Sequence, residues 1–131
     1  MGSAMKVVNN YMGNVLAVLT AETVNLAEAA GLERDLALSV LRETAAGKGM
    51  LNRWPNKVWA GDTSPGFMID LASKDVGLGL ELAYQLGSPA LTGAGARQGQ
   101  SLARMLGYGR QDNSALYLAM RDLRQGKTPK A

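Results

Sequence analysis

Residues 4–31 read AMKVVNNYMGNVLAVLTAETVNLAEAAG, and this stretch decides the fold. No proline interrupts it. Beyond about Val15 it is apolar on nearly every face, as is typical of a helix enclosed by others. We therefore expect one long helix that ends at Gly31 as its C-cap and forms the spine of a bundle. The apolar residues that recur at the three- and four-residue steps of an α-helix are Met5, Val8, Met12, Val15, Leu16 and Leu19.

Shorter helical segments, separated by turns rich in glycine and proline, follow this stretch. Residues 60–66 carry turn chemistry, and residues 125–131 are expected to form a loose tail. We predict an all-α fold, a bundle of about six helices forming one domain over residues 1–124. In the segment 33–45, the pattern turns Leu36, Val40 and Leu41 inward. The predicted helices are 33–45, 69–86, 90–106 and 114–124, with a short one within 50–59.

Composition narrows the chemistry that is open to the chain. It has 131 residues, of which 47% are hydrophobic and 19% charged, which favours one folded domain over disorder. Cysteine and histidine are absent, so thiolate sites and a histidine base are excluded, and we predict no metal site. Proton transfer falls to Lys, Asp, Glu or Tyr. No apolar run is long enough to cross a bilayer, which favours a cytoplasmic protein without membrane contact.

The positive charge and two glycine motifs do not predict a nucleic-acid or dinucleotide site. The net charge is +3, but the basic residues are scattered and lack interleaved aromatic residues, so no nucleic-acid binding is predicted. The motifs Gly77-Leu-Gly79 and Gly93-Ala-Gly95 contain the G-x-G of a dinucleotide fingerprint, but neither follows a predicted strand. We interpret both as sites of close helix packing.

Lys6 and Asn10 are the pair that most resembles a reactive site. They lie four residues apart and so share one face of the first helix. Lys6 falls in the first turn, where the positive end of the helix dipole disfavours an ammonium and so favours proton exchange. The structural alternative is that Lys6 is an ordinary exposed residue of the helix start. Lys74 and Asp75 could likewise form only a surface ion pair.

Three segments match one family pattern in the same order. Residues 2–10, GSAMKVVNN, are similar to G-x-x-x-K-x-x-N-[NQ], and residues 21–32, AETVNLAEAAGL, to A-E-A-x-x-L-A-x-x-x-G-L. Residues 66–75, GFMIDLASKD, are similar to G-F-x-x-x-L-x-x-K-D-L, with Val76 in place of the last leucine. Nearly the whole chain thus resembles the C-terminal helical domain of the β-hydroxyacid dehydrogenases, the family of 3-hydroxyisobutyrate dehydrogenase and tartronate semialdehyde reductase. The implied fold is like the C-terminal domain of 6-phosphogluconate dehydrogenase.

The resemblance also implies roles for individual residues. Lys6 would be the catalytic general acid/base, which protonates the carbonyl oxygen as hydride arrives. Asn10, Phe67 and Asp75 would bind a small hydroxyacid or semialdehyde substrate, and Lys74 would reach NAD or NADP near the nicotinamide. The family's Rossmann domain is missing from this chain, so the chain alone is expected to be inactive. A homo-oligomer, a dimer or larger, is also expected.

Two other functions stay open from the sequence. A stand-alone helical dimerisation or interaction module would keep the fold without catalysis, and it predicts no cofactor affinity. A basic binder of anions or nucleic acid predicts an affinity that falls steeply with salt.

Overall fold

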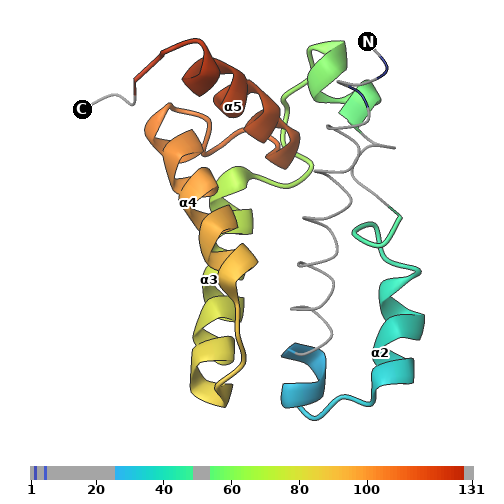
Figure 1. Ribbon diagram of the computed structural model, residues 1–131. Coiled ribbons are helices and arrows are strands. Elements are labelled where there is room, and N and C mark those ends of the chain that lie inside the picture. The colour runs from blue at the N-terminus through green and yellow to red at the C-terminus, as the bar shows by residue number, and fades with distance from the viewer. Residues whose placement is uncertain (1, 3–4, 6–25, 49–53, 129–131) are drawn as a thin grey trace.

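The computed structural model describes residues 2, 5, 26–48 and 54–128, and within these ranges every regular element is helical (Figure 1). The all-α prediction is therefore confirmed. Most of the predicted long helix lies outside the described residues, although residues 26–29 near its end are helical. The elements are α2 (Arg34–Leu41), η2 (Trp54–Asn56), η3 (Val58–Ala60), α3 (Ile69–Leu86), α4 (Leu91–Met105), η4 (Asn113–Ala115) and α5 (Leu116–Arg124), where η is a 3₁₀-helix.

Two helix ends lie at the glycines where the sequence predicts them. α3 spans the predicted residues and ends at Gly87, whose φ of 66° is in the left-handed region that glycine tolerates best. The Ser88 N–H then bonds the Ala83 carbonyl at 2.9 Å, which closes the helix end. Gly31 has a φ of 86°, as expected of the predicted C-cap.

Other segments are shorter or more divided than predicted. α2 begins after Glu33, whose carboxylate accepts the N–H groups of Asp35 and Leu36 at 3.0 and 2.9 Å, and it ends at Leu41. Residues 42–48 form turns instead of continuing the helix. The predicted helix over 114–124 divides into η4 and α5, and the short one within 50–59 consists of two 3₁₀ turns in its described part.

The core lies where α3, α4, η4 and α5 meet, with α3 and α4 running antiparallel beside each other (Figure 1). Small residues let the helices approach: a Cβ on Gly93 would lie 3.4 Å from Leu80, and one on Gly77 would meet the Arg97 guanidinium. Both G-x-G motifs lie within helices, and the interpretation as close packing holds for Gly77 and Gly93, whereas a Cβ on Gly79 or Gly95 would meet no atom within 4 Å. The buried apolar centre consists of Ile69, Ala103, Ala115 and Ala119.

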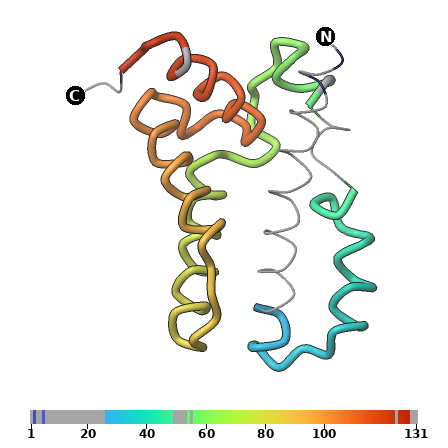
Figure 2. The backbone as a smooth tube through the Cα atoms, viewed as in Figure 1, coloured from blue at the N-terminus to red at the C-terminus, as the bar shows by residue number. Residues whose placement is uncertain are grey.

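The predicted inward face of α2 is exposed, so that prediction is wrong for Leu36 and Val40, which are 60% and 58% exposed. Figure 2 shows α2 standing apart from the α3–α4 pair. Leu32, Leu36, Val40 and Leu82 are among the residues lining a pocket of about 470 Å³ with almost no polar surface. We call these four residues the apolar face. No helix among the described residues is long and apolar enough to span a membrane.

Candidate functional site

Three of the five predicted site residues lie in the described part of the chain. Lys6 and Asn10 fall outside it. Phe67 lies in the segment that leads from η3 into α3, and Lys74 and Asp75 lie on α3 itself. These three can therefore be placed relative to one another and to their surroundings.

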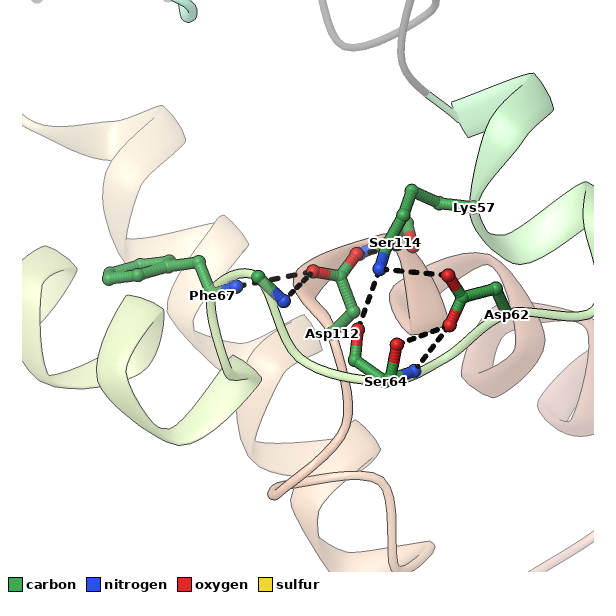
Figure 3. A network of polar contacts seen from close by, with 7 residues as sticks. Lys57, Asp62, Ser64, Phe67, Asp112 and Ser114 are labelled. Carbon is green, nitrogen blue, oxygen red and sulfur yellow. Dashed lines mark hydrogen bonds and ion pairs between the residues drawn. The ribbon is translucent and has the colours of Figure 1, made fainter.

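Phe67 borders a pocket of about 530 Å³ with a mixed polar and aromatic lining. The pocket lies between the 3₁₀ turn η2, the segment 61–68 and the start of η4. Phe67 is 43% exposed, and Figure 3 shows its ring directed away from Asp112. The ring is thus available to a ligand. The lining residues are Trp54, Lys57, Gly66, Phe67, Asp112, Asn113 and Ser114.

Asp112 holds the backbone beside this pocket from 45 residues further along the chain. Its Oδ1 accepts the N–H groups of Gly66 and Phe67 at 3.0 and 3.2 Å. Its Oδ2 accepts the N–H and hydroxyl of Ser114 at 3.0 and 2.5 Å. Figure 3 shows the carboxylate between Phe67 and Ser114. We call Gly66, Phe67, Asp112 and Ser114, with these four hydrogen bonds, the Asp112 clamp.

Backbone hydrogen bonds reinforce the clamp on both sides. The Asn113 N–H bonds the Phe67 carbonyl at 2.7 Å, and the Asp112 N–H bonds the Thr63 carbonyl at 3.0 Å. Met68 and Asp112 form an isolated antiparallel bridge, so two irregular segments pair as two strands would. This pairing satisfies backbone groups that a buried loop would otherwise leave without partners.

The environment of Asp112 favours its charged form. Asp112 is only 8% exposed, and burial works against ionisation. The hydrogen bonds from Ser114, Phe67 and Gly66 outweigh this effect and lower the pKa of the Asp112 carboxyl below its ordinary value. The clamp therefore consists of charge-assisted hydrogen bonds at neutral pH.

A second polar contact holds the other end of the same segment. The Lys57 ammonium donates to the Ser64 carbonyl at 2.7 Å and to Asp62 Oδ2 at 3.3 Å. Asp62 also accepts the Ser64 hydroxyl and N–H, and the hydroxyl bond is the main reason that the pKa of Asp62 is lowered. Lys57 lines the pocket, and its ammonium has a third N–H beyond these two bonds.

Lys74 and Asp75 are exposed on α3 and are not among the residues that line the pocket. In the described part of the chain no ion pair joins them, so the surface-pair alternative is not observed. The structure thus brings Phe67 to the pocket and leaves the two charged residues on the adjoining helix surface.

Sequence reasoning missed most of the pocket. Asp112-Asn113-Ser114 suits a helix cap by sequence, and residues 112–116 are also similar to the family pattern. Asp112 does accept the Ser114 N–H, but its bonds to residues 66 and 67 left no local signal. Lys57 lies between Trp54 and Trp59 in the sequence, and the rings of these two tryptophans meet edge-on with centroids 5.7 Å apart. This pair of tryptophans was the available pointer to the pocket.

Comparison with known proteins gives a consistent result. A profile of the family described as "NAD-binding of NADP-dependent 3-hydroxyisobutyrate dehydrogenase" matches residues 1–120. The chain is 51% identical over 117 residues to 3-sulfolactaldehyde reductase of Escherichia coli, covering 88% of the chain and 39% of that protein. It is 34% identical over 122 residues to NAD-dependent L-serine dehydrogenase of Pseudomonas aeruginosa, covering 88% of the chain and 41% of that protein.

A solved structure agrees on the fold. A putative oxidoreductase from Pseudomonas putida superposes with a TM-score of 0.75 at 18% identity, covering 89% of the chain and 41% of that protein. At this identity the likeness concerns the fold alone. The chain spans about two fifths of the length of each of these relatives.

Proposed function

Because the chain belongs to the family described as the NAD-binding domain of NADP-dependent 3-hydroxyisobutyrate dehydrogenase, we propose that it works as the C-terminal part of such an enzyme. The family's cofactor is NAD or NADP. The enzyme would interconvert a small 3-hydroxy acid and the corresponding aldehyde. A Rossmann domain would bind most of the dinucleotide, and the 131 residues of this chain would be inactive without one.

The observation that carries the proposal is the exposed Phe67 ring, held beside a pocket by the Asp112 clamp at the position of the family's G-F motif. An exposed, fixed aromatic ring suits the carbon chain of a substrate. The exposed Lys74 on the adjoining helix suits a contact with the cofactor near its nicotinamide. The described residues therefore fit a bound dinucleotide, which would supply the hydride.

The remaining chemistry is a proton transfer. Hydride addition to a carbonyl leaves negative charge on oxygen, and a nearby ammonium both stabilises that charge and supplies the proton. We assign this role to Lys6, since the chain has no histidine to serve instead. Asn10 would hydrogen-bond the substrate's polar groups, and Asp75 would lie near the substrate.

The first substrate to test is 3-sulfolactaldehyde, because the relative named for its reduction is 51% identical to this chain. A 3-hydroxyisobutyrate substrate is the second, from the family description. We define the joined enzyme as this chain fused behind the nucleotide-binding domain of the E. coli 3-sulfolactaldehyde reductase. It permits turnover to be measured with either substrate.

Lys6→Ala in the joined enzyme is expected to lower kcat by about a hundred- to ten-thousandfold, because the proton donor is lost. Affinity for the dinucleotide should stay within about twofold, since the Rossmann domain holds most of it. The matched control is Lys127→Ala, which removes an exposed lysine near the C-terminus. Stopped-flow absorbance of the reduced dinucleotide measures both quantities. Normal turnover of Lys6→Ala would contradict the assignment.

We also propose that two copies of the chain associate through the apolar face. Leu36 and Val40 follow a helical pattern that normally turns inward, yet both are exposed, as is Leu32 just before α2. Together with Leu82 they line an almost entirely apolar pocket. Exposed apolar surface of this kind favours burial against a partner, and a symmetric homodimer is the commonest solution.

The second candidate function is a stand-alone dimerisation or interaction module located, like the enzyme, in the cytoplasm. The exposure of the apolar face supports it equally well. The two candidates differ in one measurement, because the module would assemble but leave the joined enzyme without turnover. Turnover that depends on Lys6 favours the dehydrogenase.

A further inference from the structure

We infer that Asp112 is a positioning residue that fixes where the Phe67 ring projects. The inference rests on the proposed function of Phe67 and extends it to a residue 45 positions away. Asp112 would not touch substrate or cofactor through this role. It would act through the backbone of the segment that carries Phe67.

The Phe67 side chain is not fixed by packing alone. Phe67 is 43% exposed and its ring is directed away from the clamp (Figure 3), so contacts in the core hold the ring only in part. Its backbone, by contrast, is bonded on both sides. The N–H donates to Asp112 Oδ1 at 3.2 Å, and the carbonyl accepts from Asn113 at 2.7 Å. The position of the ring therefore follows from these backbone contacts.

Asp112 is itself held in place by several contacts. It is 8% exposed, and its second carboxylate oxygen is held by the N–H and hydroxyl of Ser114. Its own N–H bonds the Thr63 carbonyl, which belongs to the same segment as Phe67. A group anchored in this way can transmit its position to residues 66 and 67.

The Asp112 clamp needs a carboxylate. Asp112 accepts four hydrogen bonds, two on each oxygen. An asparagine has one acceptor oxygen and an NH₂ group that can only donate. Asp112→Asn would therefore face the N–H groups of either Gly66 and Phe67 or Ser114 with another donor. The clamp would lose one of its two sides while the side chain keeps its size.

The test is a double-mutant cycle in the joined enzyme, with Phe67→Ala, Asp112→Asn and both together. Each single variant is expected to lower kcat/KM for the aldehyde by about tenfold, and the double variant by no more than Phe67→Ala alone. The KM for the dinucleotide should not change. The matched control is Asp122→Asn, which alters another buried carboxylate that accepts the Tyr108 hydroxyl, away from the clamp. It should leave the aldehyde kinetics intact.

Hydrogen–deuterium exchange gives a readout besides activity. In Asp112→Asn the amides of residues 61–68 should exchange at least about tenfold faster than in the parent enzyme, whereas Asp122→Asn should leave them unchanged. Unchanged exchange in Asp112→Asn would overturn the inference, because the clamp would then not hold this segment.

The outcomes separate the inference from the proposed function. If Phe67→Ala lowers kcat/KM and Asp112→Asn lowers it independently, so that the losses multiply, positioning through Phe67 is refuted while the role of Phe67 stands. If Phe67→Ala has normal kinetics although exchange of residues 61–68 rises in Asp112→Asn, the proposed role of Phe67 fails and the positioning role fails with it.

Discussion

The Asp112 clamp and the apolar face differ in one respect: among the described residues, only the clamp has all of its partners. In the clamp, a buried carboxylate has four donors, and all of them lie in this chain. On the apolar face, Leu36 and Val40 have the spacing of core residues and are more than half exposed. A helical apolar pattern thus predicted burial for residues that the described part of the chain leaves exposed.

The difference between the regions has a physical origin. Hydrogen bonds are directional, so the Asp112 carboxylate requires donors at defined positions. Burial of apolar surface is not directional, and any apolar surface of suitable shape can cover the leucines. The clamp therefore argues for a precise site, and the apolar face argues for association with a partner, which we propose is a second copy.

The largest expected effect comes from breaking the apolar face. Leu82→Asp in the joined enzyme is expected to weaken self-association by at least about a hundredfold, because a carboxylate would replace apolar surface in the contact. Sedimentation velocity over a concentration series measures this change. The control is Leu91→Asp, an exposed leucine of α4 outside the pocket. Equal weakening by both variants would place the contact elsewhere.

A smaller effect is expected from breaking the clamp. Asp112→Ala should lower the free energy of unfolding of the helical domain by about 2 kcal/mol, since it leaves buried N–H donors without acceptors. Asp62→Ala removes an exposed carboxylate from the same segment and should change stability little. Urea unfolding of the joined enzyme, followed by tryptophan fluorescence, reports on the helical domain through Trp54 and Trp59. A loss for Asp62→Ala as large as that for Asp112→Ala would contradict the comparison.

The smallest effect concerns pH and sharpens the same comparison. The folded-state pKa of Asp112 is lowered, so its contribution to stability is full above the ordinary value of about 4 and is lost as the pH falls through the lowered pKa. Between pH 5.5 and roughly pH 3 the parent should therefore lose more unfolding free energy than Asp112→Asn, which has no proton to bind there. Urea titrations at each pH measure this loss for the two proteins. An equal loss of unfolding free energy in both would count against a charged clamp.

The sequence predicted those helix ends that are set by residues close together in the chain. The ends of α3 follow from apolar periodicity and Gly87, and Gly31 was identified as a cap from its place after the pattern. α2 was predicted four residues too long at its C-terminal end, because Ala45 and its neighbours suit a helix as well as the turns they form. Local preference alone does not distinguish the two.

The candidate site was predicted only in part, for the same reason. Phe67 was identified through a family motif, and it does border a pocket. The partners of its backbone lie in residues 112 and 113, and nothing near Asp112 in the sequence refers back to residues 66 and 67. Lys57 was missed because its two acceptors, Asp62 and Ser64, make it look like part of an ordinary turn.

The length of chain between the two sides of the clamp also sets the order in which this protein can fold. Closing a contact across 45 residues costs chain entropy that only later packing repays. During synthesis, residues 61–68 emerge well before Asp112, so the nascent chain can form α3 without the pocket. The pocket becomes complete only after the segment leading into α5 has left the ribosome. A messenger truncated within α4 would yield a chain in which α3 can form but the pocket beside Phe67 cannot.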